Sequence, residues 1–107
     1  MNQRFRQAYV YLNDRKAGVL EETERGYRFT YSDDFLDSPV PVSVTLPVRS
    51  QSYESRELFP FFQGLIPEGW YLEIILMKLK LDKSDLFGIL LGTCEDTVGS
   101  VTIERIS

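Results

Sequence analysis

The sequence predicts an α+β fold, with an antiparallel sheet of about five strands packed with two or three helices. In the first half of the chain, apolar and polar residues alternate over short segments separated by polar turns, which is typical of half-buried antiparallel strands. In the second half, apolar residues recur at helical spacing, and one strand-like segment follows near the C-terminus. A run of strands followed by helices favours an α+β fold over alternating βαβ units.

The first three strands are expected to form an N-terminal meander. The turns between them contain Asn13, Asp14 and Gly26, residue types that adopt positive φ angles at low cost. The third segment, YRFTYS, alternates aromatic and polar residues. A polar segment, 48–57, is expected to be a loop. The expected strands are 8–12, 17–22, 27–32 and 42–47, with a fifth at 100–106 that rejoins the sheet.

Residues that start or stop helices place three helices in the second half. Ser55 can cap a short helix over 57–65, in which Pro60 is tolerated only within the first turn. Pro67 suits the first position of a longer helix, expected over about 67–81. Capping residues also frame a third, short helix, with Asp82 or Ser84 as N-cap and Gly92 as terminator.

The helix expected over 67–81 is apolar on two faces, whereas a surface helix of a small domain is normally apolar on one. At about 100° per residue, its apolar residues divide into two stripes, separated by Glu73, Lys78 and Lys80. A single core covers one stripe, and covering both requires that the helix lie between two layers. The first stripe comprises Leu72, Ile75, Leu76 and Leu79, and the second Trp70, Ile74, Met77 and Leu81.

Two interpretations of this helix stay open. In the first, it is a central helix, with the sheet on one side and the two short helices on the other. In the second, the stripe that contains Trp70 stays partly exposed for a partner protein. Trp and Met are enriched at interfaces, and truncating a buried anchor residue costs about 2–4 kcal/mol of binding free energy. Trp70, the only tryptophan, also stands at the helix start beside Gly69.

The composition limits the classes of function. The 107 residues suffice for one core, so we expect a single domain over 1–107. A net charge of −4 disfavours direct binding to nucleic acid or to an anionic membrane. The longest apolar run, 12 residues from Trp70 to Leu81 with three charges, is shorter than the roughly 20 that span a membrane. A single cysteine, Cys94, allows no internal disulfide and fits a reducing cytoplasm.

The sequence lacks the residue patterns of an autonomous enzyme. It has no histidine, the commonest general base and metal ligand, so Cys94 has no imidazole to activate it. Gly64 and Gly69 are five residues apart, but Trp70 stands where a phosphate-binding loop needs lysine. The three aspartates within 33–37 lack the spacing of a calcium loop. We therefore expect no catalytic activity, no metal and no cofactor.

Several segments resemble, in the same order, the N-terminal subdomain of HipA-type serine/threonine kinases. The resemblance runs from about Ala8 to Ile103, and its most specific part, FFQGLIPEGW, is similar to the family signature F-[FL]-x-x-L-[LI]-P-E-G-W. In HipA-type toxins this subdomain precedes a kinase core that carries the ATP loop, the catalytic aspartate and the magnesium ligands, and none of these is matched here. The other matching segments are VYLNDRKAGVLEE, GYRFTYSDDFL, VSVTLP and DLFGILLGTCEDTVGSV.

The resemblance implies two functions. The first is an antitoxin similar to HipS of the three-gene HipBST systems, in which the small protein counteracts a separate HipA-like kinase. The start at Met1 and the end just after the last expected strand favour this expectation. The second is a non-catalytic regulatory piece of a single-chain kinase. A stand-alone adaptor unrelated to toxins is a third hypothesis.

As an antitoxin, the chain is expected to bind a HipA-like kinase in the cytoplasm, without direct contact to nucleic acid or membrane. It would inhibit the kinase by occupying a surface that must move or close during catalysis. A HipB-like helix-turn-helix protein is a candidate third member of the complex. The expected contact lies around the start and the second stripe of the long helix, at Pro67, Glu68, Gly69, Trp70, Tyr71, Ile74 and Met77.

Overall fold

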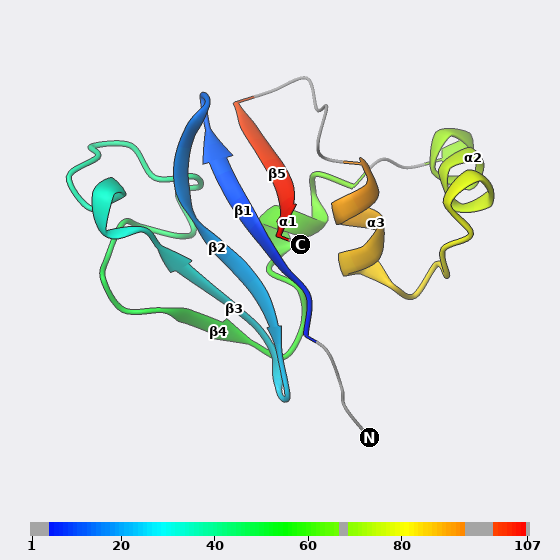
Figure 1. Cartoon of the computed structure of the whole chain (residues 1–107), viewed down its shortest axis with the longest axis horizontal. Coiled ribbons are helices and arrows are strands. Elements are labelled where there is room, and N and C mark those ends of the chain that lie inside the picture. Colours follow the sequence, from blue (N-terminus) through cyan, green and yellow to red (C-terminus); the bar gives the residue numbers. More distant parts are fainter. Residues whose placement is uncertain (1–4, 67–68, 94–99, 107) are drawn as a thin grey trace.

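The computed structural model describes residues 5–66, 69–93 and 100–106. Within these ranges, five antiparallel strands form one sheet in the order β4-β3-β2-β1-β5, accompanied by three α-helices (Figure 1). The predicted α+β class is therefore confirmed. In chain order the elements are β1 (Gln7–Leu12), β2 (Arg15–Thr23), β3 (Gly26–Tyr31), the 3-10 turn η1 (Asp33–Phe35), β4 (Tyr53–Ser55), α1 (Pro60–Gln63), α2 (Gly69–Leu79), α3 (Leu86–Thr93) and β5 (Val101–Ile106).

The meander of β1, β2 and β3 follows from its turn residues. Asn13 and Asp14 form a two-residue connection with φ angles of 51° and 67°, the left-handed values that a type I′ hairpin turn needs. The C-terminal strand β5 pairs with β1, with Val10 opposite Ile103. The last strand therefore rejoins the sheet as predicted, beside the first strand.

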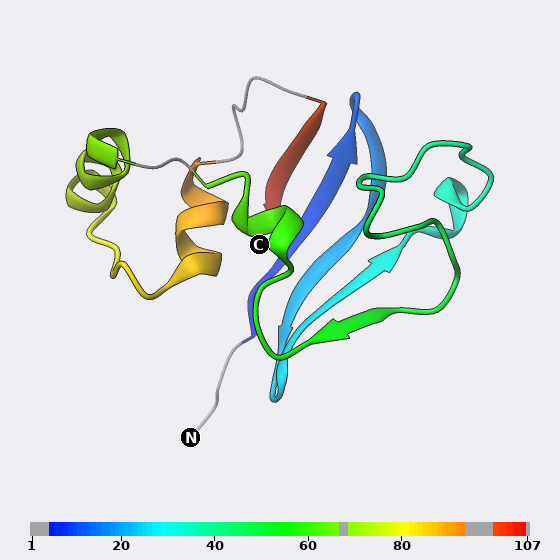
Figure 2. The same cartoon turned by 180° about the vertical axis from the view of Figure 1, so that it is seen from behind.

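One face of the sheet carries the hydrophobic core. Side chains alternate between the two faces along each strand, which brings Val10 of β1, Leu20 of β2, Phe29 of β3 and Ile103 of β5 to the same side. Figure 2 shows α1 in front of this side and α3 next to α1, near β5. The ring of Phe62 in α1 lies 5.6 Å from that of Phe29 in β3, and Phe87 of α3 stacks on Tyr27 at 5.9 Å. These contacts make α1 and α3 the cover of the sheet.

The fourth strand is not where the sequence predicted it. The segment 42–47 is a loop closed by one bridge between Ser43 and Leu46, and the fourth strand, β4, lies in the segment expected to be a loop. In a strand, residues 42, 44 and 46 would share a face. Here Val42 and Leu46 are buried whereas Val44 is 89% exposed. The Tyr31 hydroxyl holds this turn, because it accepts from the Val42 N–H and donates to the Leu46 carbonyl.

The helices differ from the prediction mainly at their ends. Helix α1 begins at Pro60 with Phe59 at the N-cap position, since Ser55 belongs to β4. The N-cap of α3 is neither Asp82 nor Ser84. Instead, the Asp85 carboxylate accepts the Gly88 N–H at 3.1 Å. Gly92 lies inside α3, which runs to Thr93.

The interpretation of the long helix as a central, sandwiched helix is wrong. Figure 1 shows α2 beside α3, outside the layers formed by the sheet, α1 and α3. The core cluster of the described residues, together with the partly buried residues that pack on it, contains no residue of α2. The sheet face is already occupied by α1 and α3, and among the described residues α2 packs mainly against α3.

Candidate protein-interaction surface

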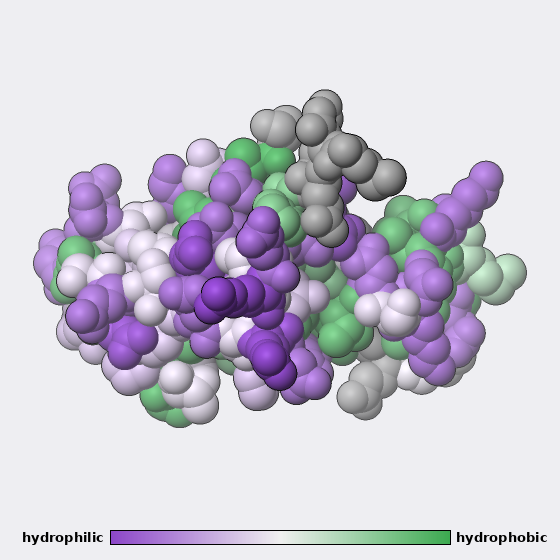
Figure 3. Space-filling view, turned by 90° about the horizontal axis from the view of Figure 1, so that it is seen from below, coloured by the Kyte–Doolittle hydropathy of each residue, from purple (hydrophilic) through white to green (hydrophobic). Residues whose placement is uncertain are grey.

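Helix α2 exposes apolar side chains to solvent. Ile74 is 41% exposed and Met77, one turn further along, is 79% exposed. Leu79, at the end of the helix, is 47% exposed. The end of the molecule formed by α2 shows apolar residues between hydrophilic ones in Figure 3, at the right of the view. Such clustered exposure is more typical of an interaction surface than scattered single apolar residues are.

The inner stripe of α2 is also only partly covered. Leu72, Ile75 and Leu76 are half-buried, and among the described side chains of α2, residues 72–79, none is fully buried. Leu79 was expected on this covered stripe, and its exposure contradicts that expectation. A side chain at Gly92 would lie 2.6 Å from Leu79 Cδ1, so the glycine permits the close approach of α2 to α3. The apolar surface of α2 therefore exceeds what α3 alone covers.

A well-defined turn ends α2. Lys80 follows the last helical residue with a φ angle of 53°, in the left-handed region. The Leu81 N–H then bonds to the Leu76 carbonyl at 3.1 Å, as in a Schellman motif. This bond satisfies a carbonyl that the helix end leaves free, so the chain leaves α2 toward α3 in a fixed direction.

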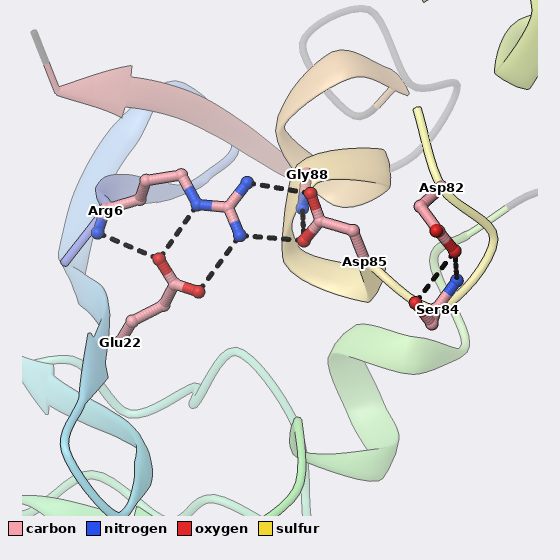
Figure 4. Close-up of polar contacts among 6 residues, drawn as sticks. All are labelled: Arg6, Glu22, Asp82, Ser84, Asp85 and Gly88. Carbon is pink, nitrogen blue, oxygen red and sulfur yellow. Dashed lines mark hydrogen bonds and ion pairs between the residues drawn. The ribbon is translucent and has the colours of Figure 1, made fainter. Parts of the chain in front are cut away.

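An ion-pair network fastens the start of α3 to the sheet (Figure 4). The Arg6 guanidinium donates to the Glu22 carboxylate of β2, with Nε 2.8 Å from Oε1. It also donates to Asp85, with Nη2 2.7 Å from Oδ1. Arg6 in addition lies over the ring of Phe87, 5.4 Å from its centroid. Through Arg6, the N-terminal segment, the second strand and the helix next to α2 are joined.

The same network shifts the pKa values of its members. Hydrogen bonds from the Arg6 side chain lower the pKa of Glu22 and of Asp85, while partial burial opposes both shifts. The two carboxylates in turn raise the pKa of Arg6. Asp82, nearby on the exposed connection, bonds instead to the N–H and hydroxyl of Ser84, each at 2.8 Å. Glu22 and Asp85 are thus paired with Arg6 at neutral pH.

The structure describes only part of the predicted contact. Ile74 and Met77 lie on α2 and are exposed as that prediction requires, although their contact with a partner stays a prediction. Gly69 is the first residue of α2, with a φ angle of 71°, and a Cβ atom added there would meet nothing within 4 Å. The remaining predicted residues, Pro67 and Glu68 and the side chains of Trp70 and Tyr71, lie outside the described parts.

The Arg6 network is a feature that the sequence did not predict. Arg6 and Glu22 are 16 residues apart, and Arg6 and Asp85 are 79 apart. Sequence periodicity does not relate residues that are so far apart along the chain. It therefore cannot predict which carboxylates pair with Arg6. The exposure of Leu79 had no sequence signal either.

The described residues contain few other candidate sites. Within these residues, no three His, Cys, Asp or Glu side chains are grouped as a metal site requires. A depression of about 690 Å³ at the β2–β3 turn and β4 is lined mostly by polar residues, including Arg25, Glu54 and Arg56. It lacks the apolar lining of a typical small-molecule site. None of the described helices has the length and apolar character needed to cross a membrane.

The fold is that of a small α+β domain whose helix α2 exposes apolar side chains. The chain belongs to the HipA N-terminal domain family, whose model matches residues 8–104. The match includes β2, β3, β4 and all three described helices, and all of β1 and β5 except their terminal residues. The resemblance noted in the sequence is therefore confirmed.

Relatives of different lengths share this domain. An uncharacterized protein from Haemophilus influenzae is 34% identical over 100 residues, which cover 94% of this chain and 92% of the relative. A putative kinase from Sinorhizobium fredii, Y4mE, is 29% identical over 97 residues, which cover 88% of this chain but 23% of the kinase. The domain thus matches a protein of its own size and also a small part of a longer one.

A solved structure has the same fold. The N-terminal domain of HipA toxin superimposes with a TM-score of 0.76 and 29% identity, covering 100% of this chain and 98% of that one. At this coverage the sheet and the helices are similar along the whole chain. The relationship to HipA therefore rests on both sequence and fold.

Proposed function

We propose that this chain is an antitoxin that binds a HipA-like serine/threonine kinase and inhibits it through the apolar surface of α2. The exposure of Ile74 and Met77 carries the proposal. Apolar residues of this size gain free energy when a partner removes them from water, and such residues form the cores of protein interfaces. The membership of the chain in the HipA N-terminal domain family supports a HipA-like kinase as the partner.

The contact that we propose continues from α2 to its N-terminal end. Pro67, Glu68, Trp70 and Tyr71 precede Ile74 and Met77 in the sequence, and we include them in the proposed contact. Bound there, the chain would hold the kinase in a state that cannot complete its catalytic motion, which requires only a higher affinity for that state. The complex would be cytoplasmic and would include a HipB-like helix-turn-helix protein, as in tripartite HipBST systems.

A second candidate function is a regulatory domain within a longer kinase. It is favoured by the similarity to the putative kinase of Sinorhizobium fredii, of which the chain spans 23%. In that case the apolar surface of α2 would pack on the kinase core of the same polypeptide. Both functions place the surface of α2 against a kinase. The kinase is a separate protein for the antitoxin and part of the same polypeptide for the regulatory domain.

Co-expression with the neighbouring genes, followed by purification, tests the proposal. A HipA-like kinase is expected to stay bound and to lose its toxicity. The double variant Ile74→Asp/Met77→Asp and the single variant Trp70→Ala should each release toxicity and weaken binding at least about 30-fold, as for an interface anchor. Val44→Asp is the matched control, because Val44 is also an exposed apolar residue but lies in the loop before β4.

The fold of each variant is checked by circular dichroism and thermal unfolding. Full neutralisation by both α2 variants would show that α2 is not the inhibitory contact. If the gene for this chain also encodes a kinase core in the same polypeptide, the chain is a regulatory domain and not an antitoxin. A free chain that binds no HipA-like kinase would contradict both.

A further inference from the structure

The end of α2 differs from the rest of the surface in charge as well as in hydropathy. Three of the four lysines in the sequence, Lys78, Lys80 and Lys83, lie within six residues of one another. The segment 77–83 also contains one aspartate, so it is positive, although the whole chain has a net charge of −4. The positive charge of lysine is thus concentrated beside the exposed apolar residues of α2.

These three lysines are exposed and unpaired within the described part of the chain. The ion pairs found there all use arginine, at Arg6, Arg15 and Arg28. The fourth lysine, Lys16, places its Nζ over the ring of Tyr9, 4.4 Å from the ring centroid. Lysines close to a helix C-terminus also interact favourably with the helix dipole, but that effect fades within the last turn. Lys83 lies beyond the turn that ends α2, so the dipole does not account for it.

The geometry of α2 puts the charges at the border of its apolar surface. Lys78 follows Met77 and lies one turn after Ile74, so it flanks both on the helix. The left-handed residue Lys80 and the bond from the Leu81 N–H to the Leu76 carbonyl fix the direction in which the chain continues. Figure 3 shows hydrophilic residues around the apolar ones at this end of the molecule. An apolar centre with a polar rim is the usual anatomy of a protein interface.

We propose that the partner surface that receives α2 is an apolar groove with a rim of carboxylates. Ile74 and Met77 enter the groove, and Lys78, Lys80 and Lys83 face the aspartates or glutamates of the rim. This inference rests on the proposed function and specifies the chemistry of the kinase surface. Charges at a rim act mainly on the rate of association, because they steer the approach of the two proteins and are screened by salt.

An anionic lipid surface would also attract an apolar helix with lysines. The remainder of this chain carries the negative excess and would be repelled by such a surface. A protein groove accommodates the helix while leaving the acidic body of the domain in solvent. A protein partner is therefore favoured, and lipid binding is an outcome that the experiment distinguishes.

The test measures association and dissociation rates of the purified chain with the HipA-like kinase, between 50 and about 500 mM NaCl. Lys78→Glu/Lys80→Glu/Lys83→Glu is expected to slow association at low salt at least about tenfold and to reduce its salt dependence. The dissociation rate should change less. Ile74→Asp/Met77→Asp should instead mainly accelerate dissociation.

The matched control is Arg25→Glu/Arg56→Glu/Arg105→Glu. It makes the same change in charge at three exposed residues on the β2–β3 turn, after β4 and on β5, none of them in an ion pair between described residues. The second measurement is sedimentation with vesicles of phosphatidylcholine and phosphatidylglycerol. Absence of sedimentation at 150 mM NaCl is expected, a salt concentration at which charges are screened beyond about 8 Å.

Three results would overturn the inference. A lysine triple variant that associates like the arginine control would show that the rim is not acidic. Lysine-dependent binding to the vesicles would identify a lipid surface instead. If the unsubstituted chain does not bind the kinase, both the proposed function and this inference fail. If it binds and the lysine triple variant associates at the same rate as the control, only the inference is refuted.

Discussion

Helices α3 and α2 are both strongly apolar, yet one is part of the core and the other is not. In α3, Phe87, Ile89 and Leu90 are almost completely buried. In α2, the described apolar side chains are half-buried or exposed. An apolar helix is stabilised when its side chains are shielded from water. Its position in the fold determines which neighbouring element shields them.

The contacts around α3 explain its position. Its ring Phe87 stacks on Tyr27 of β3, and the helix packs against β5 and α1. The Arg6 guanidinium holds Asp85 at its start. With the sheet face occupied in this way, α2 packs mainly against α3 among the described residues. Ile74, Met77 and Leu79 of α2 stay exposed.

The largest effect is expected for truncation in α3. Phe87→Ala removes a fully buried ring and leaves a cavity, so the free energy of unfolding should fall by about 3–5 kcal/mol. That is a large part of the 5–15 kcal/mol, roughly, that stabilises a domain. Urea denaturation followed by circular dichroism measures the loss. A loss below about 1 kcal/mol would mean that α3 is not part of the cooperative core.

A smaller effect is expected for Arg6→Met, which removes the ion pairs with Glu22 and Asp85 but keeps most of the side-chain volume. Above about pH 5, where Glu22 and Asp85 are ionised, the variant should be less stable than the unsubstituted chain by about 1–2 kcal/mol.

The pH dependence supplies the internal control for this variant. Arg6 lowers the pKa of both carboxylates in the folded state, so their contribution is present above the ordinary carboxylate pKa values of about 4. It is lost as the pH falls through the lowered folded-state values, where protonation breaks the ion pairs. The stability difference should therefore narrow toward pH 3. A difference that is independent of pH would indicate lost packing on Phe87 instead of lost ion pairs.

The smallest effect on stability is expected in α2. Met77→Ala removes a side chain that is 79% exposed, so the free energy of unfolding should change by less than about 0.5 kcal/mol. The same variant should weaken binding to the kinase if the proposed function is correct. A stability loss close to that of Phe87→Ala would show that α2 is packed in solution and would remove the difference between the two helices.

Local patterns predicted most of the secondary structure. The predictions failed where a contact with a residue distant in the sequence determines the conformation of a segment. The alternation in 27–32 and the Asn13–Asp14 turn predicted the meander correctly because neighbouring residues suffice for both. The segment 42–47 has the composition of a strand, but the Tyr31 hydroxyl holds it as a turn. The three-residue strand β4 lies at the edge of the sheet and is recognised only through its pairing with β3.

For the candidate surface, the sequence predicted an excess of apolar helix surface and identified only some of the exposed residues. Ile74 and Met77 are exposed as expected, and Leu79 is exposed although it was assigned to the covered stripe. The exposure of a helical residue depends on the helix that lies against it, and the contact with Gly92 of α3 depends on the fold of the whole chain.

The amino-acid sequence is sufficient to predict an antiparallel sheet, a set of helices and an excess of apolar helix surface, because periodicity and turn chemistry are local properties. That α1 and α3 cover the sheet and that α2 lies outside follows from contacts between distant segments. One sheet face has a limited apolar area. Two apolar helices compete for it, and the contacts of Phe87 and Arg6, made across the fold, determine which helix is buried.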